Sequence, residues 1–98
     1  KEQLPLSSAF LKSSVRRGQE ASFYGWRKAK AISKNVKIYR KKAGASKFIL
    51  VDTVTVDETG YYEYNFKAKK LQLKNGTYKF KAVSGGVTSP KQSLEITK

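Results

Sequence analysis

Through the middle and the end of this chain an apolar residue occurs at every second position, with polar residues between. Such alternation is typical of β-strands with one buried face, whereas a helix would repeat its apolar positions every 3.6 residues. Segments rich in turn residues separate the alternating stretches. The pattern predicts seven strands, at residues 6–15, 20–26, 35–41, 48–56, 61–66, 77–83 and 87–97.

The same alternation assigns an inward and an outward face to each strand. Apolar and aromatic side chains mark the inward positions, which are Val36, Ile38, Tyr62, Tyr64, Phe66, Tyr78, Phe80, Ala82, Leu94 and Ile96. On strands 35–41 and 77–83 the outward positions are Lys37, Tyr39, Lys41, Lys79 and Lys81. These two strands are therefore predicted to be apolar toward the core and basic toward solvent.

The number of apolar faces predicts the architecture. One antiparallel sheet of this length could not cover all of them, so we expect an all-β, antiparallel two-sheet sandwich of about seven strands. Ser84-Gly85-Gly86 has the glycines that a tight hairpin requires, and Pro90 marks its strand as an edge or bulged strand. Residues 27–34 are interpreted as a solvated loop. The length predicts a single domain over residues 1–98, with 1–5 as a flexible lead-in.

The segment LQLKNGTYKFKA, residues 71–82, resembles the entry to the sixth strand of immunoglobulin-like and fibronectin type III-like domains. Leu73 and Tyr78 have the spacing of the tyrosine corner of those folds. Gly18 and Gly25 around the second strand, the run VKIY at 36–39 and the turn at 57–61 are similar to bacterial extracellular modules, including surface-layer repeats. The resemblance implies an immunoglobulin-like sandwich with an adhesive, spacer or lattice-forming role outside the cell and no catalysis.

Composition narrows the chemistry. The chain has no His, Cys or Met, the residues that most often carry acid–base, nucleophilic or soft-metal chemistry. We therefore predict no enzymatic activity, no cofactor and no metal site. Asp57 and Glu58 are adjacent carboxylates, but an Asp-x-x-Gly segment is far more typical of a type I turn than of a calcium site. No stretch approaches the roughly 20 apolar residues of a membrane span.

Charge is the feature that indicates a partner. The chain has 21 Lys and Arg residues but only 7 Asp and Glu residues, for a net charge of +14. Solubility needs a net charge of only about 2 to 8, so the excess predicts an anionic ligand. With immunoglobulin-like connectivity, strands 35–41 and 77–83 are neighbours, which would place Lys37, Tyr39 and Lys41 beside Lys79 and Lys81. The acidic residues Glu20, Glu63 and Glu95 fall on other strands. A merely solvated basic face is the alternative.

Other basic residues border this predicted face. Arg40 and Lys42 have the opposite pleat phase, so a twist or bulge must turn them toward solvent. Four loop lysines ahead of strand 77–83 are predicted to extend the face at one end: Lys67, Lys69, Lys70 and Lys74.

Trp26, Arg27 and Lys28 form a second candidate site. An aromatic ring among basic residues suits the stacking of sugars or nucleic-acid bases with cationic guidance. Tyr24 would share the face of Trp26. The alternative is that Trp26 belongs to the core.

The leading hypothesis is a non-catalytic, extracellular bacterial module that binds an anionic cell-wall polymer or acidic polysaccharide. With about five contacts between basic side chains and the polymer, the affinity would fall several hundredfold from low to moderate salt. Two alternatives stay open: a structural surface-layer or adhesin repeat that contacts neighbouring protein domains, and a small secreted cationic effector that acts on anionic membranes or cell walls. Nucleic acid ranks behind these, because recognition-helix, RRM-like and OB-type patterns are absent.

Overall fold

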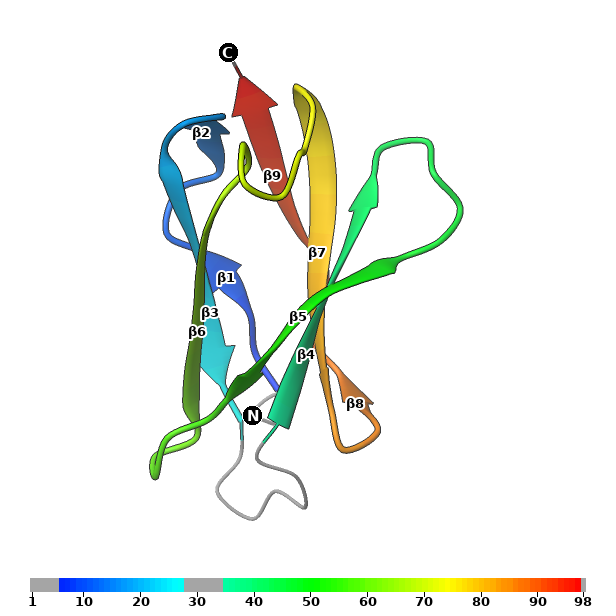
Figure 1. Ribbon diagram of the computed structural model, residues 1–98. Coiled ribbons are helices and arrows are strands. Elements are labelled where there is room, and N and C mark those ends of the chain that lie inside the picture. Colours follow the sequence, from blue (N-terminus) through cyan, green and yellow to red (C-terminus); the bar gives the residue numbers. More distant parts are fainter. Residues whose placement is uncertain (1–5, 28–34, 98) are drawn as a thin grey trace.

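Strands make up most of the protein in the computed structural model, which describes residues 6–27 and 35–97 (Figure 1). In chain order they are β1 (Ala9–Phe10), β2 (Ser14–Arg16), β3 (Glu20–Trp26), β4 (Asn35–Lys42), β5 (Ile49–Thr55), β6 (Tyr61–Lys67), β7 (Gly76–Ser84), β8 (Val87–Thr88) and β9 (Gln92–Thr97). Within these two described ranges no helix could cross a bilayer.

Two sheets are formed, one of three strands in the order β1-β3-β6 and one of six in the order β2-β9-β7-β4-β5, with β8 beside β7. Figure 1 shows β3 and β6 in one layer and β4, β7 and β9 in the other. The predicted all-β, two-sheet architecture is confirmed. One detail of the prediction is wrong: β2 pairs with β9 in parallel, so the six-stranded sheet is mixed and not purely antiparallel.

The predicted first strand, 6–15, is divided between the two sheets. Phe10 of β1 pairs with Phe23 of β3, whereas Val15 of β2 pairs with Ile96 of β9. The chain changes sheet over the three residues between β1 and β2, and the amide of Glu95 donates to the carbonyl of Ser13 there at 2.9 Å. One continuous alternating segment thus serves two layers.

The predicted last strand is interrupted at Pro90, which has no amide hydrogen to donate to the ladder. Ser89 maintains the link to β7 with two hydrogen bonds: its amide donates to the Ala82 carbonyl at 2.8 Å, and its hydroxyl accepts from the Ala82 amide at 2.9 Å. The irregularity expected at Pro90 is therefore present, although β9 is not an edge strand, because β2 and β7 flank it.

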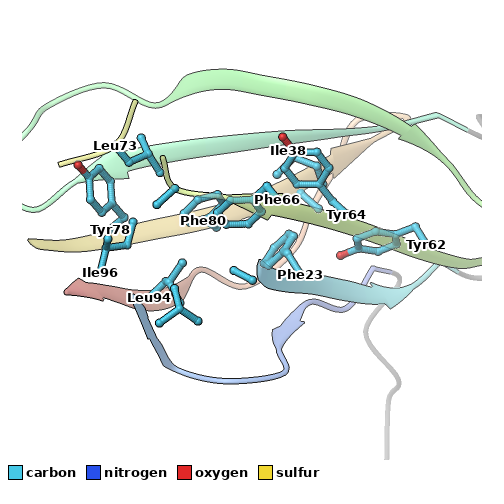
Figure 2. Packing of buried hydrophobic residues seen from close by; sticks show 14 of the residues in the cluster. Phe23, Ile38, Tyr62, Tyr64, Phe66, Leu73, Tyr78, Phe80, Leu94 and Ile96 are labelled. Atoms are coloured by element: carbon cyan, nitrogen blue, oxygen red, sulfur yellow. The ribbon is translucent and has the colours of Figure 1, made fainter. Parts of the chain in front are cut away.

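One hydrophobic cluster lies between the sheets (Figure 2). Phe23 of β3, Phe66 of β6 and Phe80 of β7 meet at its centre, with the Phe80 ring centroid 5.8 Å from that of Phe23 and 5.3 Å from that of Phe66. Every position predicted to face inward is buried: Val36, Ile38, Tyr62, Tyr64, Phe66, Tyr78, Phe80, Ala82, Leu94 and Ile96. The core therefore fixes which residues of β4 and β7 face solvent.

The tyrosine-corner geometry suggested by the spacing of Leu73 and Tyr78 is confirmed. The Tyr78 hydroxyl donates to the Lys74 carbonyl at 3.0 Å, while Leu73 and the Tyr78 ring are buried. Figure 2 shows Tyr78 at one end of the core and Tyr62 toward the other. This bond holds the loop before β7 against the strand that carries Lys79 and Lys81.

Strand β5 ends the six-stranded sheet, so within residues 6–27 and 35–97 one of its sides has no neighbouring strand. Ile49 and Leu50 are 54% and 50% exposed there. The pairing with β4 changes register at this point, because Ile38 pairs with Asp52 but Tyr39 pairs with Leu50, which leaves Val51 as a bulge. Bulges are common at sheet edges, where they increase the local twist.

Candidate functional site

Register brings the predicted basic residues of β4 and β7 together. Tyr39 pairs directly with Lys81, and Lys41 pairs directly with Lys79. Directly opposite side chains in an antiparallel pair lie about 5 Å apart at Cβ, so these residues are neighbours. Lys37 is on the same face, two residues before Tyr39, and is exposed. The spatial part of the prediction is confirmed; we call these five residues, with Phe48 and Lys91 described next, the basic face.

Phe48 is the centre of the basic face. The Lys81 ammonium lies 4.3 Å from the centroid of its ring, the Lys41 ammonium 5.3 Å and the Lys91 ammonium 5.8 Å. Lys81 is also 5.7 Å from the Tyr39 ring. The negative face of an aromatic ring attracts cations, which offsets part of their mutual repulsion. Three ammonium groups are thus held around one ring.

Neither Phe48 nor Lys91 was identified from the sequence as a functional residue. Phe48 precedes Leu50 by two positions, and Leu50 pairs with Tyr39, so period-two phase alone puts Phe48 on this face. No comparable signal identifies Lys91, because it follows the break at Pro90 and reaches the face only through the return of the chain to β9.

The strands of each sheet carry two acidic residues, and on β5 Asp52 pairs with Ile38, so it has the phase of the core and not that of the basic face. Glu20 and Glu63 are exposed on β3 and β6 of the three-stranded sheet. Glu95 is exposed on β9, where it pairs with Thr77 and lies diagonal to Lys79. The Glu95 carboxylate therefore offsets charge at the Lys79 side of the basic face, and the lysines around Phe48 form its most positive part.

Arg40 and Lys42 do not join the basic face. Arg40 pairs with Phe80 and Lys42 with Tyr78, and the register of β4 with β7 is continuous, so both keep the phase of the core. The bulge expected near them occurs instead in the pairing of β4 with β5. Lys42 lines a hollow of about 520 Å³ together with Arg17, Lys74 and Asn75.

The predicted extension through Lys67 is wrong, because Lys67 lies on β6 in the other sheet, opposite Glu20. Lys69 and Lys70 are exposed in the loop that precedes β7, and Lys74 lines the hollow just described. The basic face is therefore extended by Phe48 and Lys91, and not by Lys67.

Trp26 is on the surface, with 52% of it exposed, so it does not belong to the core. Its ring lies 6.2 Å from that of Tyr24 and 5.1 Å from that of Tyr61, measured between centroids. Tyr24 is on the same face of β3, as expected, and Tyr61 pairs with Trp26 across the strands. Three aromatic rings therefore gather on the outer face of the three-stranded sheet.

Arg27 is not part of this surface, which corrects its assignment as a ligand contact. It is only 6% exposed, because alternation that turns Trp26 outward turns the next residue inward. Its amide donates to the Gly60 carbonyl at 2.8 Å, and one terminal nitrogen approaches the Ser84 carbonyl at 3.4 Å. Lys28, the third residue of the predicted site, lies outside the described residues.

A chain of hydrogen bonds lies beside the three rings. The Tyr61 hydroxyl donates to one Glu63 carboxylate oxygen at 2.7 Å, and the side-chain amide of Asn65 donates to the other at 2.7 Å. The Ser22 hydroxyl donates to the Asn65 carbonyl at 2.6 Å. The bond from Tyr61 lowers the pKa of Glu63, with the bond from Asn65 acting in the same direction, and raises the pKa of Tyr61. Glu63 is therefore an ionised, pre-oriented acceptor.

The Asp57 carboxylate is an acceptor of hydrogen bonds within the turn before β6. It accepts hydrogen bonds from the Thr59 hydroxyl at 2.6 Å, the Thr59 amide at 2.8 Å and the Tyr61 amide at 3.0 Å. These bonds, with that of the Thr59 side chain first, lower the pKa of Asp57. Across the parts of the chain that the structure describes, Asp, Glu, His and Cys form no group of three or more that could hold a metal ion.

Known proteins add no assignment to this geometry. No protein-family model matches the chain, and no curated protein matches it.

Proposed function

We propose that this chain is a non-catalytic, extracellular immunoglobulin-like module that binds an anionic cell-surface polymer through the basic face. The polymer class is a teichoic-acid-like phosphodiester chain or an acidic polysaccharide of a bacterial surface. The single observation that carries the proposal is the gathering of Lys41, Lys81 and Lys91 around Phe48. Like charges in adjacent strands destabilise a sheet, and a bound polyanion would relieve that cost.

The immunoglobulin-like part of the proposal is supported by strand order. A three-stranded β1-β3-β6 sheet faces a sheet in which β9, β7, β4 and β5 follow one another, with the first segment of the chain shared between both. The bond from Tyr78 to Lys74 lies at the entry to β7, where immunoglobulin-like folds have their tyrosine corner. These features support the assignment of fold family that the proposal uses.

Spacing along the strands suits a repeating ligand. Residues two apart on a strand are separated by about 6.8 Å, so Lys79 and Lys81 present ammonium groups at a regular interval, and Lys37 and Lys41 at twice that interval. A flexible polymer with regularly spaced phosphates or carboxylates can meet several of these groups at once. Each neutralised anion releases a counterion, which makes binding entropically favourable and strongly salt-dependent.

The test uses fluorescein-labelled wall teichoic acid and labelled polygalacturonate, titrated with the protein at 50 and 200 mM NaCl. If binding uses five contacts, the affinity should fall by about 500-fold over that range of salt, on the scale measured for nucleic acids. The five contacts are those of Lys37, Lys41, Lys79, Lys81 and Lys91. Affinity that does not change with salt for both polymers would overturn the proposed mechanism.

A matched pair of variants tests the location. Lys81→Gln and Lys67→Gln remove the same charge, but Lys81 is on the basic face and Lys67 is on β6 of the other sheet. We expect Lys81→Gln to reduce the salt slope by about one unit and Lys67→Gln to leave it nearly unchanged. Equal effects of the two variants would mean that binding depends on net charge alone, and the basic face would not be the site.

A further inference from the structure

We propose that the outer face of the three-stranded sheet is a second binding site, separate from the basic face, that takes a neutral carbohydrate ring. The aromatic surface, defined as Tyr24, Trp26 and Tyr61, would stack against the apolar face of the sugar. The polar row of Ser22, Glu63 and Asn65 would bond its hydroxyl groups.

Register assembles this site across only two strands. Trp26 pairs with Tyr61, Tyr24 with Glu63, and Ser22 with Asn65, so each aromatic or polar residue of β3 stands opposite a partner on β6. From Trp26 toward Ser22 the surface therefore changes from aromatic to polar. A sugar ring has the same division, with C–H groups on its faces and hydroxyl groups around its edge.

A hollow of about 180 Å³ lies where the two kinds of residue meet, lined by Leu11, Ser22, Tyr24, Tyr61 and Glu63. Sites for drug-sized ligands are larger, at about 300 to 1,000 Å³, so this hollow suits one small ring at a time. A longer oligosaccharide would extend from it across Trp26, which is half exposed and lies 5.1 Å from Tyr61 between ring centroids.

Hydrogen-bonding capacity at the hollow matches a polyol. Glu63 accepts one bond on each oxygen, from Tyr61 and from Asn65, and an ionised carboxylate has about four acceptor positions. Two therefore remain for hydroxyl donors. The Asn65 amide and the Tyr24 hydroxyl supply further donors next to them. The bonds within the row hold these groups in place before a ligand arrives, which lowers the entropic cost of binding.

Charge and ring geometry exclude two other ligand classes. Glu63 lines the hollow and would repel a phosphate group placed there, whereas the charge of Glu20 is offset by Lys67 opposite it. A quaternary ammonium group would need rings that enclose it. Here Tyr24, Trp26 and Tyr61 pack against one another, with centroid separations of 5.1 to 6.5 Å, and the net charge of +14 opposes a cation. A neutral ligand meets neither obstacle.

The chain has one tryptophan, Trp26, so intrinsic tryptophan fluorescence reports on this surface alone. The experiment titrates the protein with cellohexaose, xylohexaose, chitohexaose and maltohexaose at 50 and 200 mM NaCl. We expect a saturable change in Trp26 emission with at least one of them, at an affinity that changes less than twofold with salt. Absence of saturable binding for all four at 10 mM would overturn the proposal, as would saturation by choline or by oligothymidylate in their place.

Variants locate the site. Tyr24→Ala keeps the reporter and should weaken oligosaccharide binding by about tenfold; Glu63→Gln should weaken it severalfold by replacing a charged acceptor. Lys69→Gln, in the loop before β7, is the control and should leave the affinity for the oligosaccharide unchanged. Trp26→Ala removes the fluorescent reporter, so its binding is monitored through backbone amide chemical shifts. In this variant the oligosaccharide should no longer change the chemical shifts of β3 and β6 residues. Unchanged affinity in folded Tyr24→Ala and Trp26→Ala protein would overturn the site.

Discussion

The Tyr62 hydroxyl donates a hydrogen bond of 2.5 Å to the backbone carbonyl of Ser7, a residue 55 positions earlier in the chain. The bond passes over Gly25, where a Cβ would lie 2.1 Å from the Ser7 carbonyl oxygen and 2.7 Å from the Tyr62 oxygen. Burial also raises the pKa of Tyr62, so its proton remains available for this bond across the ordinary pH range. The segment before β1 is thus held against β3 only because residue 25 has no side chain.

Gly25→Ala should therefore destabilise the protein by about 2 to 4 kcal/mol, because the backbone of Ser7 must move and the bond to Tyr62 is lost. Urea unfolding followed by circular dichroism measures the change. Gly18→Ala is the matched control, since a Cβ at Gly18 meets nothing within 4 Å, and it should change stability by less than about 0.5 kcal/mol. Similar losses in both variants would contradict the close approach at Gly25.

Tyr78→Phe should cost about 1 kcal/mol of stability, since it removes the hydrogen bond to Lys74 and keeps the buried ring. Tyr39→Phe removes a hydroxyl on the half-exposed outer face of β4 and should be nearly neutral. Chemical denaturation of the two variants side by side gives the comparison. Native stability in Tyr78→Phe would show that the corner bond contributes nothing.

Acid should destabilise the turn before β6. The pKa of Asp57 is below its ordinary value of 3.8, so its contribution is complete above that value and is lost as the pH falls through the folded-state pKa. Unfolding midpoints measured from pH 6 to pH 2 should fall less steeply in Asp57→Asn than in the native chain. Glu58→Gln removes a carboxylate outside these turn hydrogen bonds and should keep the native slope.

Phe48 and Lys81 should be energetically coupled. A double-mutant cycle with Phe48→Leu and Lys81→Gln should give a coupling free energy of about 0.5 to 1 kcal/mol, the size expected for an exposed cation–π contact. The same cycle with Lys37→Gln in place of Lys81→Gln should give a value near zero. Equal coupling for both lysines would indicate a general effect of net charge.

Lys79→Glu should stabilise the fold and weaken polymer binding at the same time. Lys79 directly faces Lys41 across the strands, so the substitution replaces a like pair by an opposite pair; Glu95 lies only diagonal to this position, so its new repulsion is the smaller effect and the net gain is about 0.5 kcal/mol at low salt. Lys67→Glu has the reverse effect on stability, because Lys67 already faces Glu20. Thermal unfolding at low salt measures both. A loss of stability in Lys79→Glu would contradict the assigned register.

The positions of β4 and β7 were predictable because alternation acts locally: once Val36 and Ile38 face inward, Lys37 must face outward, and the same holds for Lys79 beside Phe80. Trp26 and Arg27 illustrate the limit. Treating residue 27 as the start of a loop concealed that the alternation of β3 continues through it and buries the arginine.

Long-range features had no local signal. Nothing in residues 14–16 indicates a parallel partner at the other end of the chain, and Lys91 reaches Phe48 only after the chain has returned to the six-stranded sheet. The alternation places Tyr61 and Glu63 on a strand and gives no further information about them. Their place beside Trp26 depends on the pairing of β3 with β6, which the sequence pattern does not specify.

The unpaired side of β5, with Ile49 and Leu50 exposed, bears on how copies of the protein behave when crowded. Open strand edges invite lateral pairing, and mutual repulsion at +14 keeps free copies apart. A polyanion that neutralises the neighbouring lysines would remove that barrier while raising the local concentration of the protein. Copies gathered on one polymer would then bring their β5 edges within reach of one another.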